Sequence, residues 1–115
     1  MATASRAWVA WRDGDAQATR DAATVATRLW DDGAFRYPFR WVALLPVLAL
    51  DVEAGELLAA GAAIAEMLEP GQQRLPDPLE SALAASLAAR AHGDAGETRA
   101  ALARSVDTAR SLGYL

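Results

Sequence analysis

The sequence predicts an all-helical domain made of three helical hairpins, and three observations support this prediction. Alanine, leucine and arginine, which favour helices, dominate the composition, whereas the β-branched and aromatic residues that strands prefer are thinly spread. A motif that begins with a glycine followed by an acidic residue recurs at positions 14, 55 and 93, a period near forty residues, and segments rich in turn residues separate the copies. The length of 115 residues fits one domain.

The recurring motif is clearest in its first and last copies. Residues 14–22 and 93–101 share glycine, aspartate, alanine, threonine, arginine and alanine at equal offsets. The middle copy begins at Gly55-Glu56, so that the glycines at 14, 55 and 93 lie 41 and 38 residues apart. Each copy is typical of a tight corner between two helices. Glycine ends the first helix in a left-handed conformation, and the acid begins the second helix near its positive dipole end.

Small residues accompany these corners at positions where two antiparallel helices would have to approach closely. The position five residues after the glycine holds Thr19, Ala60 and Thr98 in the three copies. The position seven residues before it holds Ala7, Leu48 and Ser86. The position twelve residues after it holds Ala26, Met67 and Ser105. The middle copy departs from the rule at Leu48 and Met67.

The corners and breakers predict helices over about residues 2–13, 15–31, 37–54, 56–68, 77–92 and 94–112, grouped into hairpins of about 1–33, 34–71 and 72–115. The hairpins are separated at residues 31–33 and 69–78, where glycine and proline interrupt helices. Pro46 falls inside the third helix. We expect it to kink that helix; the alternative is that Phe35–Leu45 forms a separate segment.

The corner sequence and its two following small positions resemble the helical hairpins of the tetratricopeptide superfamily, although the period exceeds that family's usual length. This resemblance implies a right-handed helical solenoid. The alanine- and arginine-rich style, Leu45-Pro46 and the ending of residues 109–115 are similar to the repeat regions of large bacterial LuxR-type regulators and multidomain nucleotide cyclases. The resemblance therefore implies a domain of a larger signalling or transcription regulator.

Composition argues against several classes of function. The net charge of −4, with acids and arginines interspersed, does not favour direct binding of nucleic acid. The absence of cysteine excludes disulfides and thiolate metal sites, and no apolar run is long enough to cross a membrane. We therefore expect a cytoplasmic protein.

The sequence predicts no enzyme activity, no metal and no cofactor. It has neither the lysine nor the strand that a nucleotide-binding loop needs. His92 precedes Gly93 at a predicted helix end, where an imidazole is typical of capping. We interpret the acids at 31, 32, 53 and 56 as solvated charges. Four serines without a basic partner are interpreted as packing or surface residues, namely Ser81, Ser86, Ser105 and Ser111.

Candidate partner-binding residues follow from the tetratricopeptide resemblance, which implies a concave face made by the first helix of each hairpin. Its lining positions would be Trp8, Trp11 and Arg12, then Leu45, Ala49 and Val52, then Leu83, Leu87 and Arg90. The groove would be apolar with arginine at its rim, suited to an amphipathic helix or an extended peptide that carries an acid. The alternative is that these residues are ordinary core.

A second aromatic cluster spans residues 36–41. Arg36 and Arg40, with Trp41 and its aromatic neighbours, could hold an anionic ligand, or could simply cover the junction between two hairpins. We thus predict an interaction module for a protein or peptide partner, with a possible homodimer. The alternative function is a sensor in which this cluster and Trp8 and Trp11 enclose a small effector.

Overall fold

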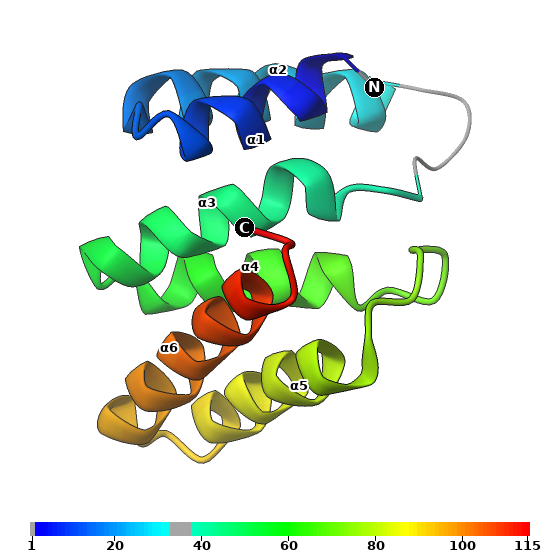
Figure 1. Cartoon of the computed structure of the whole chain (residues 1–115). Coiled ribbons are helices and arrows are strands. Elements are labelled where there is room, and N and C mark those ends of the chain that lie inside the picture. The colour runs from blue at the N-terminus through cyan, green and yellow to red at the C-terminus, as the bar shows by residue number, and fades with distance from the viewer. Residues whose placement is uncertain (1, 33–37) are drawn as a thin grey trace.

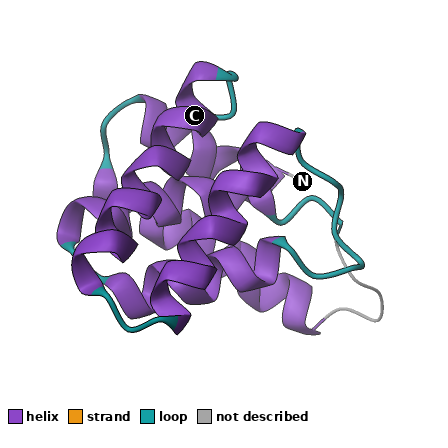
Figure 2. Cartoon of the chain, turned by 90° about the horizontal axis from the view of Figure 1, so that it is seen from below, coloured by secondary structure: helices purple, strands orange, loops and turns teal. Residues whose placement is uncertain are grey.

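The structure is a computed structural model that describes residues 2–32 and 38–115, and these residues form helices joined by loops (Figure 2). The helices are α1 (Ala2–Arg12), α2 (Ala16–Asp32), α3 (Trp41–Ala54), α4 (Leu57–Met67), α5 (Asp77–Ala91) and α6 (Ala95–Ser111). The predicted all-α class and the order of helices are confirmed. The predicted ends agree to within a residue everywhere except at the start of α3.

The start of α3 differs from the prediction because a turn over residues 38–40 precedes it. Pro38 has no N–H to donate to a helix, and its carbonyl instead accepts a 2.8 Å hydrogen bond from the backbone N–H of Gln73 in a distant loop. Pro46 is buried and α3 runs unbroken through it. The alternative of a separate segment ending at Leu45 is therefore wrong.

The three predicted corners are confirmed. Gly14, Gly55 and Gly93 all have left-handed backbones, with φ of 77°, 73° and 77°. At the first two corners, the residue after glycine donates its N–H to a carbonyl five residues earlier, from Asp15 to Ala10 (2.9 Å) and from Glu56 to Asp51 (2.8 Å). These bonds satisfy carbonyls that the end of the helix would otherwise leave unpaired.

The first and last corners are capped by the same two interactions. The Oδ1 atoms of Asp15 and Asp94 accept the N–H of the third residue after them, at 2.9 and 3.0 Å. Their main-chain carbonyls accept the hydroxyls of Thr19 and Thr98, both at 2.7 Å. The shared sequence of the two copies therefore encodes a helix N-cap. In the middle copy the longer Glu56 makes no such side-chain cap.

Replacing Glu56 by aspartate is expected to raise the free energy of unfolding by ~0.5–1 kcal/mol, because the shorter side chain can adopt the capping geometry of Asp94. The reciprocal change, Asp94→Glu, should lower it by a similar amount. Urea unfolding followed by circular dichroism measures both. Equal stability of Glu56→Asp and the unmodified protein would show that the middle corner cannot use a cap.

The positions that the sequence marked as small are all interior. All nine side chains are buried, and these include the two large ones, Leu48 and Met67. In the last hairpin the side chains of Ser86 and Ser105 meet, with their Oγ atoms 3.0 Å apart between α5 and α6. The predicted close approach of the two helices is therefore present there.

The hairpins lie in three tiers, with α1 and α2 at the top of Figure 1, α3 and α4 in the middle, and α5 and α6 at the bottom. Helix α3 packs against α1 and α2, as in stacked hairpins. The last hairpin is rotated relative to this stacking. Its second helix, α6, packs against α3, whereas α5 packs against α4 and makes no close backbone approach to α3. The expected solenoid is therefore not confirmed, and α1, α3 and α5 do not line one continuous face.

The molecule is correspondingly compact, with a radius of gyration of 13.3 Å. A globular domain of this length has a radius of ~13 Å. The main core joins leucines and other apolar residues of α3, α4, α5 and α6 with Leu75 and Leu115. The first hairpin instead meets α3 through a cluster whose buried members are all alanines, Ala7, Ala23, Ala26 and Ala43. Trp30, Val42 and Val47, which are partly buried, pack against this cluster.

The loop before α5 is fastened by Glu80. Its carboxylate accepts the Nε–H of Arg74 (2.9 Å) and the backbone N–H of Leu75 (3.0 Å). The hydrogen bond from Arg74, followed by that from Leu75, lowers the pKa of Glu80 below its usual value of 4.5.

Because the pKa of Glu80 is lower in the folded protein, the carboxylate stabilises the fold above about pH 4.5, and this contribution is lost as the pH falls through the folded pKa. The Glu80→Gln variant should therefore be less stable than the unmodified protein at neutral pH and similar to it at about pH 3. Urea titrations at both values measure the difference. A gap that persists unchanged in acid would point to packing instead of charge.

Candidate partner-binding site

The first predicted group of binding residues gathers on one side of α1. Trp11 and Arg12 follow Trp8 by three and four residues, a spacing that places their side chains on the same helix face as that of Trp8. Trp41, the first residue of α3, lies beside them, because Trp8 and Trp41 line the same surface depression. We call Trp8, Trp11, Arg12 and Trp41 the aromatic face.

The chain's own C-terminal segment, Gly113–Leu115, lies on the aromatic face. Gly113 ends α6 with φ of 83°, and Tyr114 donates its N–H to the carbonyl of Ala109 at 2.8 Å. This is the same turn as at the first two corners, but no helix follows it in the described chain. Helix α6 ends within one residue of its predicted end, and the sequence predicted no contact for the segment that follows it. Its signal was the glycine after residue 112, followed by an aromatic and an aliphatic residue.

Two hydrogen bonds hold the main chain of the segment. The indole Nε1–H of Trp8 donates to the carbonyl of Tyr114 at 3.0 Å, and a guanidinium N–H of Arg12 donates to the main-chain oxygen of Leu115 at 2.9 Å. The guanidinium of Arg12 also stacks over the ring of Trp8, 5.2 Å from its centroid. These donors bind main-chain oxygens of the segment and not its side chains.

Two side chains of the segment supply apolar contact. The rings of Tyr114 and Trp41 are 4.8 Å apart between centroids and tilted by 51°. Leu115 is only 3% exposed and belongs to the main core. An aromatic residue followed by an aliphatic one is therefore the pattern that the aromatic face accommodates.

An apolar depression of about 180 Å³ adjoins the segment. It is lined by Ser5, Trp8 and Val9 of α1, Trp41 and Val42 of α3, and Gly113. Val9 is 51% exposed at its edge. The aromatic face thus continues into a shallow apolar surface that the C-terminal segment borders.

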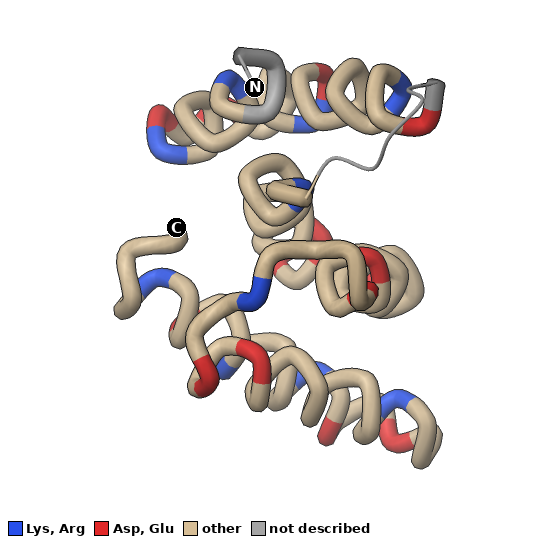
Figure 3. The backbone as a smooth tube through the Cα atoms, turned by 90° about the vertical axis from the view of Figure 1, so that its right-hand side faces the viewer, with Lys and Arg blue, Asp and Glu red and all other residues tan. Residues whose placement is uncertain are grey.

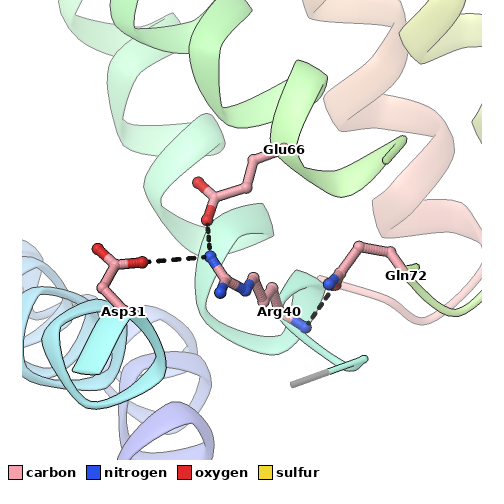
Figure 4. A network of polar contacts seen from close by, with 4 residues as sticks. All are labelled: Asp31, Arg40, Glu66 and Gln72. Carbon is pink, nitrogen blue, oxygen red and sulfur yellow. Dashed lines mark hydrogen bonds and ion pairs between the residues drawn. The ribbon is translucent and has the colours of Figure 1, made fainter. Parts of the chain in front are cut away.

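The second predicted cluster, by contrast, is used to join hairpins. The guanidinium of Arg40 pairs with Glu66 of α4 and with Asp31 of α2 (3.6 Å) (Figure 4). It also stacks over the ring of Trp30, 5.5 Å from its centroid. The backbone N–H of Arg40 donates to Oε1 of Gln72 at 3.1 Å. An anionic effector at Arg40 would compete with two carboxylates. These contacts agree with the junction interpretation; Arg36, its proposed partner, lies outside the described residues.

Trp41 takes part in both regions. Its indole Nε1–H donates to Oε1 of Gln73 at 2.9 Å, in the loop that also contacts Arg40, while its ring packs on Tyr114. The structure thus separates the predicted aromatic and arginine residues. Trp8, Trp11, Arg12 and Trp41 surround the C-terminal segment, and Arg40 faces the junction of the first two hairpins.

The remaining predicted residues do not extend the aromatic face. Leu45 and Leu83 are completely buried and Ala49 is nearly so, which makes them core residues. Val52 and Leu87 are half-buried and pack against the same core. Arg90 is exposed and lies across Gly61 of α4, where a Cβ would clash with it. The implied groove is absent at these positions because the last hairpin presents α6 to α3.

The residues considered for chemistry have structural contacts. His92 bonds through Nδ1 to the carbonyl of Ala88 (2.8 Å) at the end of α5, and Ser86 and Ser105 bond to each other. Among residues 2–32 and 38–115, no group of three or more histidines and acids is placed to hold a metal ion. Arginines and acids are interspersed over all three tiers (Figure 3). In the same ranges, no helix combines the length and the apolar character that crossing a membrane requires.

No protein-family model, curated protein or solved structure matches the chain.

Proposed function

We propose that this chain is an interaction module that binds an extended segment of another polypeptide on the aromatic face. The observation that carries the proposal is the chain's own segment there, whose main-chain oxygens accept hydrogen bonds from Trp8 and Arg12. Side-chain donors aimed at a backbone, next to apolar contact surface, are the chemistry of peptide recognition. Trp and Arg are also the residues most enriched among energetically dominant contacts in interfaces.

The setting of such a module is proposed from the resemblance to bacterial regulators. In that setting, the domain receives a partner protein, and other domains of a longer chain produce the output. The corners, their caps and the buried small positions support a helical scaffold of this kind. Arginines and acids interspersed along the chain fit a polypeptide partner better than a nucleic acid (Figure 3).

The proposal is tested with a random-peptide library displayed on phage, selected against the 115-residue chain. Enriched peptides, measured by fluorescence anisotropy, should bind the Val9→Glu variant at least about tenfold more weakly, because a charge would be placed at the edge of the apolar depression. The matched control is Val25→Glu, since Val25 on α2 is 49% exposed and Val9 is 51% exposed. Peptides that bind both variants equally would place the binding surface elsewhere.

A further inference from the structure

We propose that Gly113–Leu115 is a displaceable internal ligand of the aromatic face, and that the partner presents an extended segment in which an aromatic residue precedes an aliphatic one. This inference rests on the proposed function and specifies its partner. A main-chain oxygen of the partner would replace the main-chain oxygen of Leu115 as the acceptor for Arg12. This oxygen would belong to a backbone carbonyl or to a terminal carboxylate.

The position of the segment supports this role, because it bridges two parts of the fold that otherwise do not meet closely. In the described residues, neither helix of the first hairpin closely approaches α5 or α6. Trp8 and Arg12 of α1 are nevertheless bonded to Tyr114 and Leu115, which follow α6. The segment therefore acts as a clasp between the first and last hairpins.

Release of the segment would leave the helical turns of α6 in place, but it would break the capping bond from the N–H of Tyr114 to the carbonyl of Ala109 and expose Leu115 of the main core. A competing segment must therefore supply an equivalent aliphatic side chain. The chain's own segment begins at Gly113, beyond the last turn of α6, and its two hydrogen bonds to α1 come from side chains. The first hairpin contacts α3 through the alanine cluster irrespective of the clasp. A competing segment could restore the same contacts if it places an aromatic ring against Trp41, as Tyr114 does, and an aliphatic side chain where Leu115 lies. Its binding would release the last hairpin from α1.

The test uses a labelled peptide of residues 109–115, acetylated at its N-terminus, and the full chain carrying Tyr114→Ser and Leu115→Ser together. We expect the double variant to bind this peptide at least about tenfold more tightly than the unmodified chain, whose own segment competes. A peptide with the same two substitutions should not bind. The matched control is Leu112→Ser, because Leu112 is 42% exposed and precedes the clasp. Amidated and free-acid peptides distinguish a carbonyl from a carboxylate opposite Arg12.

A measurement on the unmodified chain complements the variant. In an NMR titration with excess peptide, the backbone amides of Tyr114 and Leu115 should move to unfolded-like positions while those of α6 stay in place. Equal affinity for the unmodified chain and a folded double variant would overturn the inference. Loss of helical circular dichroism in the double variant would also overturn it, because a segment required for folding cannot be exchanged. If the inference fails while the Val9-dependent peptides still bind, the proposed function stands without this internal ligand.

Discussion

Replacing Leu45 by alanine is expected to lower the free energy of unfolding by ~2–5 kcal/mol, because the leucine is completely buried in α3 and the surrounding core cannot collapse fully around the cavity. Chemical unfolding measures the loss. The prediction distinguishes two interpretations of Leu45. As a groove residue it would affect binding with little change in stability, whereas as a core residue it affects stability first.

The matched control for Leu45→Ala is Leu58→Ala. Leu58 lies in α4 of the same hairpin and is 72% exposed. Its replacement should change the free energy of unfolding by no more than ~0.5 kcal/mol. Similar losses for the two variants would contradict the assignment of Leu45 to the core.

Replacing Ser105 by leucine should be the second large effect, lowering the free energy of unfolding by ~1–3 kcal/mol. The Oγ atoms of Ser86 and Ser105 are 3.0 Å apart between α5 and α6, and both residues are buried. Additional carbon atoms at this position must force the helices apart or distort side chains. Thermal unfolding and urea titration measure the loss.

The control at the same position is Ser105→Ala, which removes the hydroxyl without adding volume. Ser86 would keep its hydrogen bond to the carbonyl of Ala82 (3.1 Å), so no buried group is left unpaired. We expect a change below ~1 kcal/mol. A loss as large as that of Ser105→Leu would show that the hydrogen bond, and not the close approach, is what the position requires.

Much of the local structure could be predicted from the sequence because the signals are local. A left-handed glycine and an aspartate cap act within a few residues, so the corners at 14–15 and 93–94 were identified correctly. The start of α3 was misplaced because Pro38 makes a turn whose carbonyl is satisfied by Gln73, a residue far along the chain. That partner could not be foreseen from neighbouring residues.

The binding face was only partly predictable for the same reason. Trp8, Trp11 and Arg12 share a face through helical periodicity, which the sequence shows directly. The assignment of Leu45 and Leu83 to a groove depended on how hairpins stack. The turned last hairpin makes both of them core and places the C-terminal segment against Trp8 and Arg12.

The sequence by itself determined the helices, their corners and the positions where hairpins pack, since propensity, capping and periodicity depend on residues within a few turns of one another. Only the tertiary structure decided which helix of the last hairpin meets α3 and what lies on the aromatic face. Those outcomes arise from burial of apolar surface between distant segments, which is non-directional and favours whichever arrangement removes most of it from water. The final glycine, tyrosine and leucine show the difference: they encode the end of a helix locally, and their contact with α1 exists only in the folded molecule.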